Sequence, residues 1–219
     1  MMKSTLIPVS MPDITDREKE EVLQVLETPF LSLGPKHREF EDIFSQFLGI
    51  SHSISVSSGT SGLHLAVKAL ELGRGDGVIT TPFSFIASSN VLLFEDIQPI
   101  FVDVERDTLN IDPALIERFI EKNTKVKKGK IIDSRTGAII RAILPVHIFG
   151  HPANMKEIMG IAEKYDLFVI EDACEALGAE VKFEGELTGL GPQVTWHKVG
   201  TLGNVGVFAF YPNKQITTG

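Results

Sequence analysis

Lys214 lies a few residues beyond 205–210, an apolar segment with the character of a strand. An amine at the end of a strand, in an electropositive and partly dry pocket, can act as a nucleophile and then move a proton. The alternative interpretation is a surface lysine, because this residue type is mostly exposed. Chemistry at Lys214 therefore depends on which other side chains the fold brings to the same edge.

Two consecutive carboxylates, Glu171 and Asp172, end another apolar segment of the chain. A carboxylate in the position of Asp172 can pair with a pyridinium nitrogen, which keeps that nitrogen protonated and the ring able to accept electrons. The alternative is a carboxylate that caps the following helix. A metal site is disfavoured, because His and carboxylate partners at ligand spacing are missing nearby.

Two further segments carry groups that suit a flat, phosphorylated ligand. In 57–62 (SSGTSG), backbone N–H groups and hydroxyls at a helix start can bind phosphate. The alternative interpretation of this segment is a tight turn with an N-cap. Phe85, after the next predicted strand, can stack on a flat ring. The alternative interpretation is that Phe85 is a residue of the hydrophobic core. All four segments follow predicted strands. Together they predict a site for pyridoxal 5'-phosphate (PLP).

The elements that position these residues alternate along the chain. We expect strands at 53–57, 77–81, 99–104, 138–146, 167–171 and 205–210, and helices at 63–72, 85–94, 113–120 and 155–165. Two helices precede most of them, one after the capping-box pair Thr15 and Glu18 and one from Pro35 to Gly49. Segments 122–130 and 181–198 are expected to be surface loops or hairpins. This order indicates a three-layer α/β fold, with a mostly parallel sheet between helices on both faces.

The composition is that of a globular protein of 219 residues, with 43% hydrophobic and 23% charged side chains. The formal net charge of −8 argues against general binding to nucleic acid or to an anionic membrane surface. The single cysteine, Cys174, excludes an internal disulfide and fits a reducing cytosol, so we expect a cytoplasmic protein. No apolar run is long enough to span a bilayer, and residues 1–12 lack the pattern of a signal peptide.

Six segments carry a resemblance to a known family. In chain order they are SSGTSGLHLA, TTPFSFIASSNV, PIFVDVERDTLNID, PVHIFGHPANM, VIEDACEALGA and GVFAFYPNKQITTG. They resemble the DegT/DnrJ/EryC1/StrS family, the PLP-dependent sugar aminotransferases of fold type I (aspartate aminotransferase-like), over nearly the whole chain. The resemblance implies transfer of an amino group from glutamate to a nucleotide-linked keto-deoxysugar, in the biosynthesis of cell-surface polysaccharides or antibiotic sugars.

The same resemblance implies roles for residues around the cofactor ring. Lys214 is similar to the lysine that holds PLP as a Schiff base and moves the proton. Asp172 is similar to the partner of the pyridine nitrogen. Glu175 takes the place where members carry a Gln, His or Glu near the phenolic oxygen of the cofactor.

Other implied roles concern the phosphate, the ring face and a partner subunit. Gly59 and Thr60 are similar to the phosphate-binding residues, and Phe85 to the residue that stacks on the ring. Asn213 stands where the family often sends an asparagine into the partner subunit's cofactor site. Because family active sites lie at a homodimer interface, a homodimer is implied.

The chain departs from the family pattern at three places. Ala209 stands where many members have a serine hydroxyl on the phosphate, and 181–198 is longer than the usual short hairpin. Members continue after the lysine motif with a small domain, so the resemblance implies that residues 1–219 are the cofactor-binding large domain with its N-terminal helices, and that the C-terminal small domain is absent. The alternative is a truncated, catalytically incompetent homologue that dimerises or binds PLP without turnover.

Two other enzyme classes fit the sequence less well. Related PLP-dependent sugar dehydratases have a histidine in the lysine position, so Lys214 favours transamination. The glycines of 73–77 resemble a dinucleotide-binding pattern, but they follow a predicted helix rather than a strand, which is the wrong context for that fingerprint. His147 and His151 are interpreted as structural or substrate-edge residues rather than as metal ligands.

Overall fold

The computed structural model describes residues 8, 10–186 and 192–218, and the chain forms two compact units. The terminal unit consists of Met1–Val56 together with Phe210–Gly219. The sheet unit is Ser57–Ala209. The two ends of the chain therefore belong to one unit, and the central part of the chain forms the other.

The terminal unit contains the helices α1 (Asp16–Leu26) and α2 (Pro35–Leu48), which confirms both predicted N-terminal helices. α1 begins with the predicted capping box, in which Glu18 accepts the backbone N–H of Thr15 at 2.8 Å. On α2, the rings of Phe40 and Phe44 stack with centroids 5.7 Å apart. Phe210 packs against both rings, at centroid distances of 5.3 and 5.6 Å. Aromatic packing thus joins α2 to the C-terminal segment within this unit.

The predicted strand at 53–57 is wrong, because this segment bonds to α2 instead of to another strand. Ser53 Oγ donates to the carbonyl oxygen of Glu41 at 2.5 Å, and the backbone N–H of Ser55 donates to Glu41 Oε1 at 2.7 Å. Ser55 Oγ also lies 2.6 Å from Nε2 of His37. Short serine side chains give the segment local partners on the helix, which compete with strand pairing.

The sheet unit is built on a sheet of seven strands among the described residues. In chain order they are β1 (Asp76–Thr80), β2 (Gln98–Phe101), β3 (Thr124–Lys127), β4 (Lys130–Asp133), β5 (Ile139–Leu144), β6 (Phe168–Asp172) and β9 (Val205–Val207). Five run parallel in the spatial order β2-β1-β5-β6-β9. The β3-β4 hairpin is antiparallel and joins the start of β5 through the pair Ile132 and Ile139. The remaining predicted strands are confirmed, although β2 ends at Phe101 and β9 at Val207, each three residues short of its predicted end.

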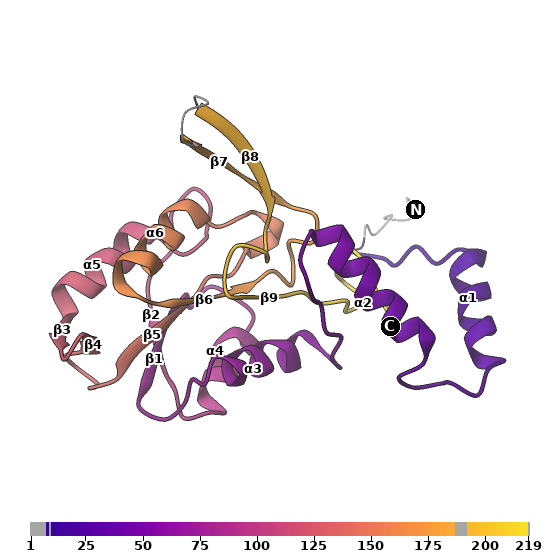
Figure 1. Cartoon of the computed structure of the whole chain (residues 1–219), viewed down its shortest axis with the longest axis horizontal. Helices are drawn as coiled ribbons and strands as arrows, with labels where there is room; N and C mark the ends of the chain where they lie inside the picture. Colours follow the sequence, from indigo (N-terminus) through magenta and orange to yellow (C-terminus); the bar gives the residue numbers. More distant parts are fainter. Residues whose placement is uncertain (1–7, 9, 187–191, 219) are drawn as a thin grey trace, which may run out of the picture. The chain divides into compact units, whose positions relative to one another are not determined.

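Four helices cover the two faces of this sheet (Figure 1). They are α3 (Gly59–Ala69), α4 (Ala87–Leu93), α5 (Pro113–Asn123) and α6 (Met155–Tyr165). α3 and α4 pack on one face through a core that includes Leu63 and Leu92. α5 and α6 pack on the other face through a core that includes Ile116 and Ile158. The predicted α/β fold, with a mostly parallel sheet between helices, is confirmed.

A separate antiparallel hairpin, β7 (Glu180–Glu186) and β8 (Pro192–Lys198), forms the region predicted as a loop or hairpin (Figure 1). Val181 and Phe183, on one face of β7, pack against buried clusters of the sheet unit. Trp196 on β8 is 61% exposed. In the described part of the chain, no helix combines the length and apolar character needed to cross a membrane.

Candidate functional site

Asp172, the last residue of β6, lies at the carboxyl edge of the sheet and is almost fully buried. Its Oδ2 accepts a hydrogen bond of 2.6 Å from Ser88 Oγ on α4, and its Oδ1 accepts one of 3.2 Å from the backbone N–H of Cys174. A carboxylate offers about four acceptor positions, so these two bonds within the described residues leave capacity for a further donor. Ser88 was not predicted, because it is 84 residues away in the chain.

The start of α3 lies against the segments that follow β6 and β9. A Cβ added to Gly59 would lie 3.0 Å from Sγ of Cys174 and 3.1 Å from Cβ of Ala209, so a larger residue would require these neighbours to shift by a few tenths of an ångström. Ser58 caps the helix with its side chain. Within the described residues, the backbone N–H groups of Gly59 and Thr60 have no acceptor, and they stand at the positive end of the helix dipole. This is the geometry of an anion site.

Phe85 lies in the connection between β1 and α4 and is 75% exposed, which excludes the alternative that it is a core residue. Glu175 follows β6, and its Oε2 accepts the backbone N–H of Phe149 at 3.0 Å. Phe149 lies in a short 3-10 turn, η1 (Ile148–Gly150), after β5 and has a left-handed φ of 53°. Residues that follow β1, β5 and β6 therefore share the carboxyl edge of the sheet.

Asn213 and Lys214 belong to the terminal unit, in the turn after Phe210. The backbone N–H of Lys214 donates to the carbonyl oxygen of Tyr211 at 2.8 Å, and the N–H of Thr218 returns to the carbonyl oxygen of Phe210 at 3.1 Å. The other five predicted site residues all belong to the sheet unit, at its carboxyl edge: Gly59, Thr60, Phe85, Asp172 and Glu175.

Glu171, the penultimate residue of β6, has a structural role that was not predicted. Its fully buried carboxylate accepts hydrogen bonds from the His147 ring at 3.1 Å and from the backbone N–H groups of Gly200, Leu202 and Gly203 at 2.8, 2.7 and 2.6 Å. Burial alone would raise the pKa of Glu171, but the His147 ring and the backbone N–H groups of Gly203 and Gly200 lower that pKa below its usual value. Glu171 therefore fixes the loop that leads into β9.

His147 and Asn110 hold the turn after β5 in place. Nδ1 of His147 accepts the backbone N–H of Ala153 at 3.0 Å, so we assign the ring proton to Nε2, which donates it to Glu171. Oδ1 of the buried Asn110 accepts the backbone N–H of Ile148 at 3.1 Å. These bonds support the strained turn η1, in which Phe149, the residue after Ile148, donates its backbone N–H to Glu175. Asn110 gave no recognisable signal in the sequence, because it lies 38 residues from this partner.

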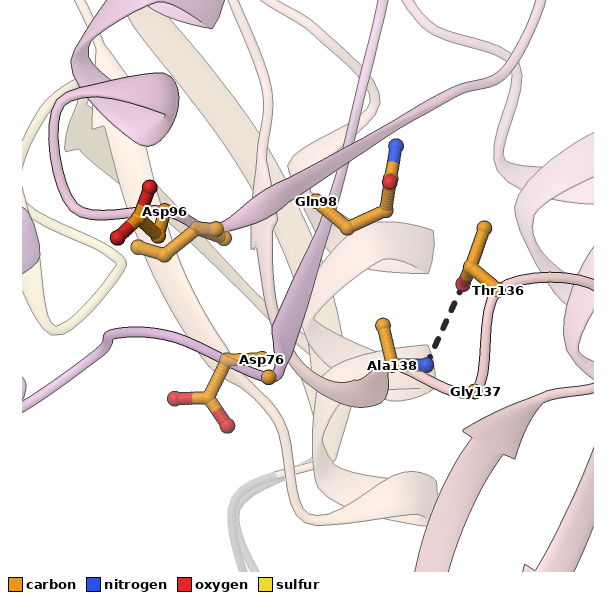
Figure 2. A pocket seen from close by; sticks show the side chains of 8 residues that line it. Asp76, Asp96, Gln98, Thr136, Gly137 and Ala138 are labelled. Carbon is orange, nitrogen blue, oxygen red and sulfur yellow. Dashed lines mark hydrogen bonds between the residues drawn. The ribbon is translucent and has the colours of Figure 1, made fainter.

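A hollow of about 260 Å³ lies at the opposite edge of the sheet, at the amino ends of β1 and β2 (Figure 2). Its lining includes the six labelled residues, Asp76, Asp96, Gln98, Thr136, Gly137 and Ala138. Asp76 already accepts the N–H of Gly73, and Asp96 pairs with Arg74 at 2.7 Å. The hollow is not part of the candidate site. Neither there nor elsewhere among the described residues do three His, Cys, Asp or Glu side chains gather as metal ligands would.

Comparison with known sequences matches residues 12–219 to the DegT/DnrJ/EryC1/StrS aminotransferase family. The chain is 36% identical over 214 residues to GDP-perosamine synthase of Escherichia coli O157:H7, covering 97% of this chain and 51% of that protein. It is 34% identical over 217 residues to the spore coat polysaccharide biosynthesis protein SpsC of Bacillus subtilis strain 168, covering 99% and 48%. The chain thus spans about half the length of the curated relatives it matches.

Comparison with solved structures gives the same picture for the fold. An aminotransferase from Psychrobacter cryohalolentis superposes with a TM-score of 0.77 at 31% identity, covering 95% of this chain and 46% of that one. PseC of Helicobacter pylori, an aminotransferase involved in the biosynthesis of pseudoaminic acid, superposes with a TM-score of 0.76 at 27% identity. That match covers 96% of this chain and 49% of PseC.

Proposed function

Because the chain belongs to the DegT/DnrJ/EryC1/StrS aminotransferase family, we propose that it binds PLP and transfers an amino group from glutamate to the keto group of a nucleotide-linked deoxysugar. The observation that carries the proposal is the buried Asp172 carboxylate, which has acceptor capacity left and lies at the same sheet edge as the open helix start at Gly59. Relatives named as a GDP-perosamine synthase and a polysaccharide biosynthesis protein support a sugar substrate.

The residues at the start of α3 fit a phosphate group. The N–H groups of Gly59 and Thr60 are the donors, and the positive end of the helix dipole attracts the anion. A side chain at position 59 would contact Cys174 and Ala209 closely, so glycine suits the tight packing of the helix start against these two residues. Ala209 adds no hydroxyl, so we assign phosphate binding to the helix start rather than to the segment after β9.

The residues around the carboxyl edge fit a flat ring with a protonated nitrogen. Asp172 would accept a hydrogen bond from the protonated ring nitrogen, and the exposed Phe85 ring would offer a stacking surface. Glu175, which follows β6, would lie near the phenolic oxygen of the cofactor. When bound, PLP supplies the electron sink that makes transamination possible. The task of Asp172 is to hold the proton on the ring nitrogen.

Nζ of Lys214 has two proposed tasks, which are covalent attachment of the cofactor and proton transfer between the substrate carbon and the cofactor carbon. Support comes from the sequence, in which Lys214 follows Ala209 by five residues within the family motif. We extend the proposal to a homodimer in which Asn213 contributes to the site of the partner subunit. A cytoplasmic location is part of the same proposal.

The first test is chemical labelling of the lysine. Addition of PLP to the purified protein should give a visible absorbance band, and borohydride reduction followed by peptide mass spectrometry should place the label on Lys214. Lys214→Arg should lose the label. Lys164→Arg is the matched control, because Lys164 pairs with Glu117 at 2.6 Å on the helical surface and should not affect labelling. Absence of the band, or label spread over surface lysines, contradicts the proposal.

A second measurement separates catalysis from binding alone. Mixing the PLP-loaded protein with glutamate should release 2-oxoglutarate in a single turnover, with loss of the visible band. A protein that binds PLP at Lys214 but releases no 2-oxoglutarate matches the alternative of a homologue without turnover. That outcome would overturn the proposed reaction and leave the proposed cofactor in place.

A further inference from the structure

The hydroxyl group of Ser88 joins two parts of the candidate site. Ser88 lies in the first turn of α4, three residues after Phe85, and is 1% exposed. Its Oγ lies 2.6 Å from Oδ2 of Asp172 and 3.2 Å from the carbonyl oxygen of Phe85. Because the carboxylate is charged and closer, it is the stronger acceptor for the hydroxyl proton.

The backbone of Asp172 is fixed on both sides. Its N–H donates to the carbonyl oxygen of Pro145 at 2.9 Å, and its carbonyl oxygen accepts the N–H of His147 at 3.0 Å. The side chain is then oriented by its two hydrogen bonds, of which one comes from Cys174, two residues further along the chain. The bond from Ser88 is the one that comes from a different element, and it sets the rotation of the carboxylate relative to α4.

We propose that Ser88 is a positioning residue, which aims the carboxylate of Asp172 at the ring nitrogen of the cofactor and keeps it aligned with the stacking segment at Phe85. This inference rests on the proposed function. A buried carboxylate group needs hydrogen-bond donors, and the Ser88 hydroxyl in the first turn of α4 provides one. Without that hydroxyl, the carboxylate can rotate away from the ring nitrogen while every group that touches the cofactor is still present.

A purely structural role for Ser88 predicts a different behaviour, and the chain offers a matched control for it. Ser89 Oγ donates to the carbonyl oxygen of Ile86 at 3.1 Å, three residues earlier in the chain. This is the same local bond that Ser88 has to Phe85, but without a bond to a carboxylate. Removal of the Ser89 hydroxyl therefore tests the effect of the local helix bond alone.

The experiment compares two probes, PLP and its analogue in which a C–H group replaces the ring nitrogen. Both carry the aldehyde and the phosphate. The dissociation constant of the analogue divided by that of PLP therefore measures the contribution of the bond between Asp172 and the ring nitrogen. Ser88→Ala should reduce this ratio by about tenfold, since hydrogen bonds to charged groups are worth roughly that much. Ser89→Ala should leave it unchanged, and Ser88→Thr, which keeps a hydroxyl, should retain most of it.

A double-mutant cycle completes the test. Asp172→Asn should abolish the preference for PLP over the analogue, and Ser88→Ala should then have no further effect on the ratio. Far-ultraviolet circular dichroism and urea unfolding confirm that each variant is folded. An unchanged ratio in Ser88→Ala, while the wild type prefers PLP, overturns the role of Ser88 and leaves the proposed function intact. A wild-type protein that binds neither compound contradicts the proposed function, and the inference falls with it.

Discussion

Glu171 and Asp172 are adjacent carboxylates at the end of one strand, and the fold uses them in opposite ways. Successive side chains on a strand point to opposite sides of the sheet, so the two residues meet different neighbours. Within the described residues, Glu171 accepts four hydrogen bonds and Asp172 accepts two. Both are buried, with 0% and 5% exposure.

The difference between the two carboxylates lies in acceptor capacity rather than in burial. The protein fills all the acceptor positions of Glu171, so this residue anchors the loop before β9. Among the described residues, the two donors to Asp172 leave acceptor positions of this carboxylate unused. A buried carboxylate with unused acceptor capacity is therefore a better sign of a ligand site than burial or strand position alone.

The largest expected effect concerns the stability of the protein. Glu171→Gln should lower the free energy of unfolding by about 3–5 kcal/mol, because the amide group faces buried N–H donors that it cannot satisfy. Urea unfolding followed by circular dichroism measures this change. Glu163→Gln, at an exposed position on α6, is the control and should change little. A loss below about 1 kcal/mol for Glu171→Gln would show that its four bonds are not an anchor.

The second prediction applies the matching change to the neighbouring residue. Asp172→Asn should cost only about 1 kcal/mol of stability, because the amide oxygen still accepts one of the two bonds. It should weaken PLP binding by about thirtyfold, the equivalent of about 2 kcal/mol, because the charge opposite the ring nitrogen is lost. An absorbance titration with PLP measures the binding. If Asp172→Asn destabilised the fold as much as Glu171→Gln, the contrast between the two residues would fail.

The smallest expected effect is the dependence of stability on pH. Because the folded pKa of Glu171 is lowered from 4.5, its ionisation contributes stability that is complete above pH 4.5 and is lost as the pH falls through the folded value. This contribution changes by at most about 1.4 kcal/mol per pH unit. Urea unfolding of wild type and Glu171→Gln between about pH 6 and pH 3 should show the stability difference narrowing in acid. A difference that widens in acid contradicts the lowered pKa.

The fold was largely predictable because its pattern is local. Alternating apolar strands and amphipathic helices, with caps such as Thr15 and Glu18, predicted the parallel sheet and its two helical layers. The failure at 53–57 has a local cause as well. Its serines bond to Glu41 and His37 on α2, and a pattern of residue types along the chain does not show which partner a hydroxyl finds.

The sequence by itself determined which side chains follow the strands, and parallel strands in one sheet bring their carboxyl ends to one edge. Phe85 and Asp172 could therefore be placed at that edge in advance. Gly59 lies there as well, but through its close approach to Cys174 and Ala209, because the strand predicted before it does not form. Only the tertiary structure decided which carboxylate stays available to a ligand. The donors to Glu171 and Asp172 include His147, Ser88 and the backbone N–H groups of Gly200, Leu202 and Gly203, which lie 24 to 84 residues away in the chain. Hydrogen bonds over such separations exist only once the chain has folded, so no local pattern encodes them.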